Sequence, residues 1–520
     1  MNSFSKENIL YRILSFTGFW FPFLIIIFTF YNSQNGLKTI GTYFCFSIIL
    51  IIINYFVKNK KVYLYVLFAN MLIYSICSFV DISHFDIFQY RITGSTIYVL
   101  IETNLNESKE FVKMYLRPKL IVTGILLLSS FFFSLLFSFR NYKQIKRPNQ
   151  ISFPKKILMV IVCFFCTLIL IKDRNHLMAY TFPKSIVKFI VERNKLTKIK
   201  LTAKGDFKDV VTKQNNEKET YVIVIGESTT RTHMGLYGYY RDTNKLLKER
   251  INELLVFDNV QAPHVHTIAS LGETLTIGNY ADPSKKYNNT LVQLFNNANF
   301  KTYLLSNQRP IGMYDTTMTL LTKASSKRIY TNSSRLTHVK DEVLLEPLKE
   351  ILNENVNKKF IIIHLMGTHV NYSNRFPSDY AIFKKQPITK FNHKKAYQQI
   401  NDYDNAVLYN DYVVNSIINY VESSNSKSFV LYFSDHGDDV YETTNMCGHS
   451  EKNGTPPMYE IPFVLWRSES YKKSKKINFI KHRKYNNRDL IHTIADLSDV
   501  NFHRFDKTKS IINPDFIETP

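Results

Sequence analysis

The stretch 221-YVIVIGESTT-230 decides the fold of the larger part of this chain. Five of its first six residues suit a fully buried strand, yet Glu227 follows at once. A carboxylate at the tip of a core strand is poorly solvated unless a positive charge compensates it. The alternative is a helix N-cap, but the three hydroxyl residues after Glu227 make better caps. A divalent cation at the strand tip is therefore the more direct explanation.

Other apolar runs follow the same pattern after about residue 216. Four more strands are expected at 299-NFKTYLLSN-307, 359-KFIIIHLMG-367, 428-SFVLYFSD-435 and 461-IPFVLW-466. Helical patterns lie between them, for example at 341–355 and 400–423. Near-continuous apolar strands that alternate with helices predict an α/β domain with a mostly parallel sheet flanked by helices.

The first third of the chain differs sharply from the rest. Five apolar stretches lie at about 14–31, 39–57, 62–80, 119–139 and 156–172. A helix needs about 20 apolar residues to cross the hydrocarbon core of a bilayer. The first stretch has no small-residue cleavage site after it, so we expect an anchor and not a removed signal peptide. Buried helices of a soluble protein are the alternative, but five of them would need a very large core.

These features predict three parts of the chain. An α-helical membrane domain with five transmembrane helices covers 1–172, and a charged linker covers 173–215. A soluble domain then covers 216–520. Basic loops stay in the cytoplasm, and 58-KNKK-61 and the loop at 140–156 are basic. The loop at about 81–118 and the soluble domain are therefore expected outside the cytoplasm.

The formal net charge is +23, which raises the question of a nucleic-acid partner. A membrane anchor and an extracytoplasmic domain exclude that class. Part of the surplus lies in the cytoplasmic loops, and part lies in 471-YKKSKKINFIKHRK-484. This run is expected to be a solvated face, with attraction to an anionic membrane surface or glycolipid as the alternative.

Cysteine usage excludes a disulfide within the soluble domain. Four of the five cysteines lie in the apolar stretches, and only Cys447 lies after them. The stability of the soluble domain must therefore come from its core.

Polar side chains gather where the predicted strands end. Glu227 and His369 lie just after two of the strands, a third ends near Asn307, and a fourth ends in Asp435 and His436. Ligands bind beyond the carboxyl ends of the strands in such a sheet. Oxygen and nitrogen ligands suit zinc, so Glu227, Asp435 and His436 form a candidate metal set. For the Asp-His pair alone, the alternative is a turn with an exposed histidine.

A nucleophile is expected in 259-NVQAPHVHTIASLGETLT-276. The sequence of this segment predicts a loop that becomes a helix near Ile268. A hydroxyl at a helix N-terminus has a favourable field for a phosphate, and a metal would activate it. The spacing alone does not choose between Thr267, Ser270 and Thr274, and plain capping remains the alternative for each.

Nine pieces of sequence, spread over the soluble domain, resemble those of a known family. In chain order they are VIVIGEST…R…GLYGYYRDTN, HTIASL…LT, LSNQ…IG…DT, DEVLLEPL, HLMGTHVNYSNRFP, YDNAVLYNDYVV, FSDHGDDVY, CGHSE and MYEIPFVLW. In this order they resemble the phosphoethanolamine transferases. These are multi-pass enzymes of the bacterial inner membrane with an alkaline-phosphatase/sulfatase-like catalytic domain in the periplasm. The five apolar stretches agree with that arrangement.

The resemblance implies a role for individual residues of this chain. It implies one zinc ion, with a second left open, held by Glu227, Thr267, Asp435 and His436. Thr267 would be the nucleophile, and His369 and His449 would hold the phosphoryl group or a second metal. Asn307 would lie near the substrate. In the loop 101–111, donor-binding positions are implied at Thr103, Asn104 and Glu107.

The chain departs from part of the family in two places. The lipid A branch has cysteine pairs in its soluble domain, whereas this chain has Pro263 and Glu273 near two of those places. It is therefore more similar to the cysteine-poor branch that modifies lipopolysaccharide core sugars. Ile311 stands where a basic residue is expected, which concerns recognition of the acceptor.

The implied reaction transfers phosphoethanolamine from phosphatidylethanolamine through a phospho-threonine and releases diacylglycerol. The acceptor would be lipid A, a core sugar or another periplasmic molecule, and the enzyme is expected to be a monomer. The alternatives are a glycerol-phosphate transferase of the lipoteichoic acid synthase type, a membrane-anchored phosphatase-like hydrolase, and a receptor with an inactive domain.

Overall fold

The fold divides into two compact units. The structure, a computed structural model, describes residues 10–33, 35–88, 91–92, 94, 96–97, 100, 105–145, 153–197, 201–213, 217–277, 288–308, 317–332 and 339–518. One unit comprises Met1–Thr103 and Phe111–Lys198, and the other comprises Asn104–Glu110 and Ile199–Pro520. The main division thus falls inside the predicted linker, and the domain limits given above stay predictions.

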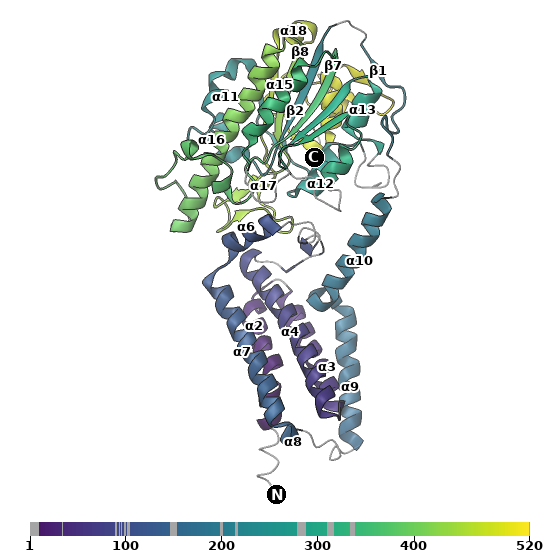
Figure 1. Ribbon diagram of the computed structural model, residues 1–520, viewed down its shortest axis with the longest axis vertical. Coiled ribbons are helices and arrows are strands. Elements are labelled where there is room, and N and C mark those ends of the chain that lie inside the picture. The colour runs from purple at the N-terminus through teal and green to yellow at the C-terminus, as the bar shows by residue number, and fades with distance from the viewer. Residues whose placement is uncertain are drawn as a thin grey trace. The chain divides into compact units, whose positions relative to one another are not determined.

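The first unit is built from helices (Figure 1). They are α2 (Thr17–Phe30), α3 (Gly36–Phe56), α4 (Lys60–Phe88), α7 (Pro118–Arg140), α8 (Tyr142–Ile145), α9 (Phe153–Lys172) and α10 (Met178–Thr197), and α6 (Leu105–Tyr115) straddles the two units. Within the described residues, α3, α4, α7 and α9 are long and apolar enough to cross a membrane. The remaining apolar stretch forms the shorter α2. Residues 10–15 are also helical, and a turn at Phe16 separates them from α2. The predicted helical membrane region is confirmed, with four long apolar helices and one shorter helix.

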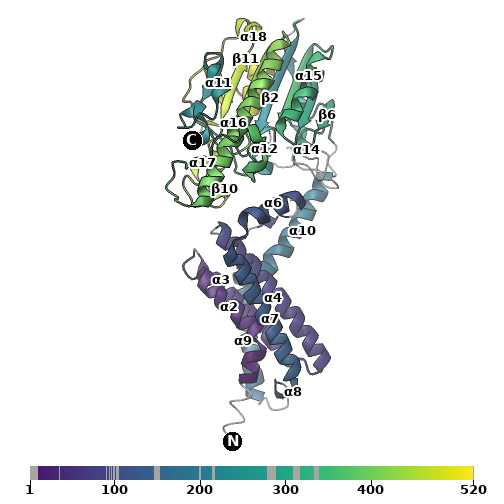
Figure 2. The ribbon, with the colours of Figure 1, turned by 60° about the vertical axis from the view of Figure 1, so that its left-hand side comes forward.

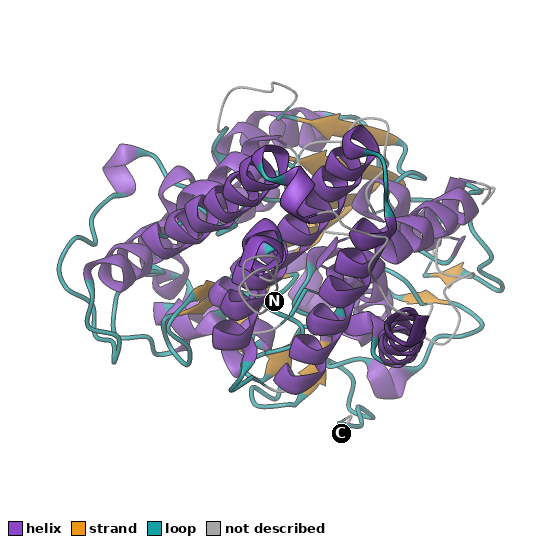
Figure 3. Ribbon diagram, turned by 90° about the horizontal axis from the view of Figure 1, so that it is seen from below, coloured by secondary structure: helices purple, strands orange, loops and turns teal. Residues whose placement is uncertain are grey.

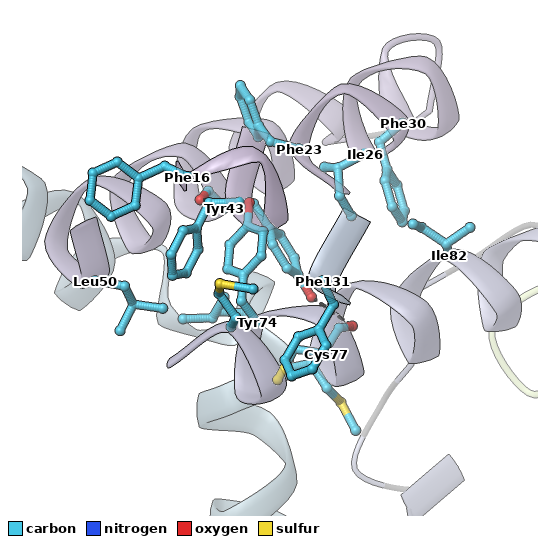
Figure 4. Close-up of a cluster of buried hydrophobic side chains, with 14 of the residues drawn as sticks. Phe16, Phe23, Ile26, Phe30, Tyr43, Leu50, Tyr74, Cys77, Ile82 and Phe131 are labelled. Carbon is cyan, nitrogen blue, oxygen red and sulfur yellow. Dashed lines mark hydrogen bonds between the residues drawn. The ribbon is translucent and has the colours of Figure 1, made fainter. Parts of the chain in front are cut away.

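Aromatic side chains form the core of this unit (Figure 4). The ring of Tyr74 packs edge-on against Phe19 and Tyr43, with ring centroids 5.5 and 5.8 Å apart. The outer faces of the helices are apolar instead of polar. On α9, for example, Val160 is 65% and Phe164 59% exposed. Exposed apolar faces of this length suit contact with lipid.

The second unit contains a seven-stranded sheet. Its order is β3-β11-β8-β2-β7-β5-β6. The strands are β2 (Glu219–Gly226), β3 (Leu254–Phe257), β5 (Lys301–Ser306), β6 (Lys327–Tyr330), β7 (Lys358–His364), β8 (Lys427–Ser434) and β11 (Phe463–Arg467). All five predicted strands are present. Every residue of β2 and β8 is buried, which explains their unbroken apolar sequences.

The sheet is mixed, with one reversed strand. Strands β8, β2, β7, β5 and β6 run parallel to one another, whereas β11 pairs antiparallel with both β8 and β3. The short strands β3 and β6 were not predicted. Both have only four residues, and β6 lies at an edge with no fully buried residue. Because strands β8, β2, β7, β5 and β6 run in the same direction, their carboxyl ends meet at one edge of the sheet.

Helices cover this sheet, and Figure 3 separates them from the strands by colour. They are α11 (Lys245–Glu249), α12 (Thr267–Thr274), α13 (Leu291–Asn297), α14 (Thr317–Leu321), α15 (Leu345–Asn353), α16 (Lys394–Ser423), α17 (Pro456–Tyr459), α18 (Glu469–Ser474) and α19 (Leu490–Leu497). Figures 1 and 2 show α15 and α16 lying along one face, where α16 packs on β8.

Short strand pairs complete the second unit. They are β1 (Val211–Thr212) with β13 (Val500–Asn501), β4 (Val260–Gln261) with β12 (Tyr485–Asn486), and β9 (Asp439–Val440) with β10 (Cys447–Gly448). All five cysteines of the chain are free, and Cys447 is buried.

Candidate active site

Two neighbouring strands deliver the acidic groups of the site. Gly226 pairs with Ser434 at the ends of β2 and β8, so Glu227 and Asp435 emerge side by side. The two residues are 2% and 0% exposed. Two buried carboxylates in adjacent positions repel each other, so the site requires a compensating positive charge.

The backbone after Glu227 takes an unusual conformation that holds the carboxylate in place. Ser228 lies in the left-handed region with φ of 59°. Its backbone N–H donates to Asp435 Oδ1 at 3.0 Å, and its carbonyl accepts from the Tyr403 hydroxyl at 2.8 Å. A strained, fully bonded turn of this kind is frequent at functional sites.

Thr267 is the hydroxyl residue that faces the carboxylate. It is the first residue of α12, and its Oγ1 lies 3.1 and 3.3 Å from the two carboxylate oxygens of Glu227. The same oxygen lies 3.5 Å from His436 Nε2. Of the alternatives left open by the sequence, Ser270 donates instead to the Asp435 carbonyl, and Thr274 is fully buried. The geometry therefore favours Thr267.

Three side chains form a compact donor set. One ligand atom each from Glu227, Asp435 and His436 lies within 4.8 Å of the others. His436 Nε2 is 3.4 Å from both Glu227 Oε1 and Asp435 Oδ2. Asp435 Oδ2 is fully buried and has no hydrogen-bond partner within the described structure. A buried carboxylate oxygen without a hydrogen bond is costly, so these residues fit a divalent cation.

The electrostatics of the donor set show what compensates the carboxylates when no ion is present. Burial raises the pKa of Glu227, but the hydrogen bond and charge of His436 outweigh it and hold that pKa well below its ordinary value. Burial and the charge of Glu227 raise the pKa of Asp435 to about 7. Burial lowers the pKa of His436, but Asp435 and Glu227 raise it to about 10. Without an ion, protonated His436 thus supplies the positive charge that compensates the two carboxylates.

A second group of potential ligands adjoins the first. One ligand atom each from His436, Asp438 and His449 lies within 4.8 Å of the others. His449 Nδ1 lies 2.8 Å from Asp438 Oδ1, and its ring centroid is 4.2 Å from that of His436. Burial and the charge of His436 lower the pKa of His449, so it is neutral near pH 7. A neutral imidazole fixed by a carboxylate at Nδ1 leaves Nε2 to accept a proton or bind a metal.

The other strand-end residues have different surroundings. His369 lies in the turn after β7, and its Nδ1 has no hydrogen-bond partner within the described residues. Asn307 is fully buried, and its amide donates to Asp341 Oδ1 at 2.8 Å and to the Val339 carbonyl. Its polar atoms thus tie strand ends together, and its substrate-binding role stays a prediction.

Gln308 is a site residue that the sequence reasoning missed. Its Nε2 donates to Glu227 Oε2 at 3.0 Å and to the Leu365 carbonyl at 3.1 Å. The available signal was its position immediately after a strand-end asparagine, since neighbouring residues at a strand end reach the same edge.

Two ion pairs brace the segment 259–276, in which Thr267 lies. His264 Nδ1 lies 2.9 Å from Glu451 Oε1, and its Nε2 lies 3.5 Å from Glu273 Oε1. The two hydrogen bonds raise the pKa of His264 to about 9. Glu273 stands near a cysteine position of the lipid A branch. Its contact with His264 joins the C-terminal end of α12 to the loop that precedes this helix.

Some predicted positions cannot be placed. Thr103, Asn104 and Ile311 lie outside the described residues, and Glu107 lies in α6 with no described side chain.

The sequence relationships agree with this geometry. Residues 219–500 match the sulfatase family. Phosphoethanolamine transferase EptC of Escherichia coli strain K12 is 31% identical over 526 residues, covering 95% of this chain and 89% of that protein. The chain belongs to the phosphoethanolamine transferase family. Phosphoethanolamine transferase CptA of Salmonella typhimurium is also 31% identical, with the same coverage.

Solved structures extend the relationship to the fold of this transferase. The C-terminal periplasmic domain of E. coli EptC, crystallised in complex with zinc, is 36% identical with a TM-score of 0.58. The alignment covers 60% of this chain and 91% of that domain. Integral membrane EptA of Neisseria meningitidis matches 97% of this chain and 98% of its own, with a TM-score of 0.71 and 19% identity. The zinc complex of a relative and the donor set found here both favour a divalent metal.

Proposed function

We propose that this enzyme transfers phosphoethanolamine from phosphatidylethanolamine to a periplasmic acceptor through a covalent intermediate on Thr267. The observation that carries the proposal is the position of Thr267 Oγ1, which lies at a helix N-terminus within 3.1 Å of Glu227 and 3.5 Å of His436. No other described hydroxyl side chain bonds to the Glu227 carboxylate except the adjacent Ser228.

The proposed metal site uses Glu227, Asp435, His436 and Thr267 as ligands, and one zinc ion is sufficient. When bound, a divalent cation would lower the pKa of the hydroxyl and neutralise charge on the phosphoryl oxygens. Asp435 Oδ2 supports this assignment, because it is buried without a hydrogen bond among the described residues and lies 3.4 Å from the proposed ligand His436.

In the first step, Thr267 Oγ1 attacks phosphorus as its proton is lost, and a new phosphorus–oxygen bond forms. The bond to the glycerol oxygen breaks, and diacylglycerol leaves after it takes up a proton. In the second step an acceptor hydroxyl loses its proton and attacks the same phosphorus, and Thr267 Oγ1 leaves. His449 or His369 carries the proton in each step, because an imidazole at the site edge can accept a proton and return it.

The proposed setting is the inner membrane, with the catalytic unit in the periplasm and lipopolysaccharide as the acceptor. The apolar helices and the basic loops between them support this orientation. The absence of disulfides supports the branch that acts on core sugars over the lipid A branch.

Intact-mass spectrometry tests the proposed intermediate. Full-length enzyme incubated with phosphatidylethanolamine should gain the mass of one phosphoethanolamine group. Thr267→Ala should lose this adduct and reduce transfer by at least about 10³-fold, as for other covalent nucleophiles. Thr274→Ala, in the same helix but away from Glu227, is the matched control and should keep the adduct.

Two results would overturn the proposal. An adduct that persists in Thr267→Ala would place the nucleophile elsewhere. Diacylglycerol release from phosphatidylglycerol, and none from phosphatidylethanolamine, would instead establish glycerol-phosphate transfer.

A further inference from the structure

One exposed loop of the catalytic unit combines positive charge with apolar side chains. The basic loop, residues 380–395 with the sequence YAIFKKQPITKFNHKK, contains five lysines and no acidic residue. It precedes and begins α16. Ile388 is 76% exposed and Ile382 58% exposed, and the neighbouring Tyr240 is 49% exposed. Large apolar side chains this exposed, in a segment that also carries five lysines, are typical of an interaction surface.

The chain holds these apolar side chains outward by specific bonds. The backbone N–H groups of Ile382 and Phe383 donate to Asn405 Oδ1 at 3.1 and 2.9 Å. The Ile388 N–H donates to the Tyr240 hydroxyl at 3.0 Å. The loop is therefore built to a defined shape, and its exposed isoleucines do not result from a lack of local structure.

The lysines of the basic loop differ from those of the other basic run. Lys384, Lys385, Lys390 and Lys394 are exposed, and none joins an ion pair found within the described part of the chain. In the run 471–484, by contrast, carboxylates neutralise several cations. The pairs there are Lys472–Glu469, Lys475–Asp496, Lys475–Asp499, Lys481–Asp258 and His482–Asp258. Within the described residues, the other run mixes paired lysines with the unpaired Lys473, Lys476 and Lys484, whereas these four lysines of the basic loop are all unpaired.

The basic loop lies against the segment that supplies the second ligand group. Thr389 Oγ1 donates to the Tyr441 carbonyl at 3.2 Å, and His393 Nε2 lies 2.7 Å from Asn445 Oδ1. Tyr441 and Asn445 belong to the stretch between Asp438 and His449. Figures 1 and 2 agree that the N-terminal end of α16 lies at the same edge of the unit as α17. Helix α17 follows the stretch between Asp438 and His449 in the chain.

We propose that the basic loop docks the catalytic unit onto an anionic phospholipid surface. Ile382, Ile388 and Tyr240 enter the boundary between headgroups and acyl chains, while the lysines bind lipid phosphates. A lipid surface is the fitting partner because the same chain carries four helices long and apolar enough to cross a membrane. Docking through this loop turns the edge of the sheet that holds Glu227, Asp435 and His436 toward the bilayer. The inference rests on the charge and exposure of the loop and needs neither the proposed intermediate nor a bound metal.

Hydrogen exchange on the full-length chain in nanodiscs tests the docking. The nanodiscs contain either phosphatidylcholine alone or phosphatidylcholine mixed with phosphatidylglycerol. Peptides from 380–393 should exchange about tenfold more slowly with phosphatidylglycerol present, and high salt should remove the protection. The triple variant K384E/K385E/I388S should lose the protection. The matched control K472E/K473E/K476E, in the other basic run, should keep it.

Three other outcomes of this experiment would overturn the proposal. Equal exchange in both lipid compositions overturns the proposal. Protection that appears only when lipopolysaccharide is added also overturns it and makes the loop an acceptor site. Loss of protection in the 472–476 variant shows unspecific charge attraction and overturns it as well. Thr267→Ala should be protected like the unmodified chain, so a failure of docking is distinguishable from a failure of the proposed chemistry.

Discussion

Glu227 ends a fully buried strand because its carboxylate is part of a shared polar site and not an isolated charge. Thr267 and Gln308 donate hydrogen bonds to it, and protonated His436 supplies the positive charge. Contacts with residues far away in the sequence thus explain why a carboxylate follows this buried strand. Partners from three separate segments meet at one strand tip.

Gln308 should position the carboxylate for metal binding. Its amide bonds to Glu227 Oε2 and to the Leu365 carbonyl, so it fixes the orientation of a proposed ligand. We expect Gln308→Ala to weaken zinc affinity by about 10–100-fold, as for other residues that support metal ligands. Competition with a chromogenic zinc chelator measures this affinity. The control Asn259→Ala removes a half-buried amide that bonds to the His482 carbonyl and not to Glu227, so its zinc affinity should be unchanged. An unchanged affinity in Gln308→Ala would refute the positioning role.

Metal binding should release protons. Without an ion, the pKa of Asp435 is raised to about 7 and that of His436 to about 10, so both groups are at least partly protonated near neutral pH. Ligands must be deprotonated to bind a metal, so protons compete with the ion at low pH. Affinity should therefore rise between about pH 6 and 8. Calorimetry in buffers of different ionisation enthalpy should report net proton release, whereas an affinity independent of pH would contradict this account.

At the scale of elements, the turn after β7 packs directly on the turn after β2. Gly367 has φ of +53°, and a Cβ placed on it would lie 2.7 Å from the Glu227 backbone nitrogen. The Thr368 N–H donates to the Glu227 carbonyl at 3.0 Å. Asp341 accepts the Met366 and Gly367 N–H groups at 2.8 and 2.9 Å, which holds this turn in place.

Gly367→Ala should therefore disturb both stability and the site. The side chain would be strained in the left-handed region and would press on the Glu227 backbone, so we expect a loss of about 1–3 kcal/mol in unfolding free energy. Zinc affinity should fall with it. Thermal unfolding and chelator competition measure the two effects. Gly41→Ala is the control, since nothing lies within 4 Å of its added Cβ. Unchanged affinity in Gly367→Ala would show that the close approach is unimportant for the site.

At the scale of the whole molecule, the catalytic unit has its own sheet, core and donor set. We expect residues 199–520, expressed alone, to fold and bind zinc, because the sheet and all three carboxylate and imidazole ligands lie within them. Transfer from phosphatidylethanolamine in vesicles should fall by about 10²-fold or more, because the tether that concentrates enzyme and lipid is lost. Circular dichroism, metal analysis and diacylglycerol release measure these properties. Full activity of the isolated unit would show that the membrane helices do not concentrate the donor.

The sequence by itself determined the apolar helices, the five long strands and the residues at the strand ends, because each is a local pattern of burial or spacing. Only the tertiary structure decided which of three hydroxyls faces Glu227, that Gln308 joins the site, and that Asn307 is occupied by Asp341. It also revealed the reversed β11 and the short strands β3 and β6. These features depend on contacts between segments far apart in the chain, and no local pattern records where a side chain points once the strands have paired.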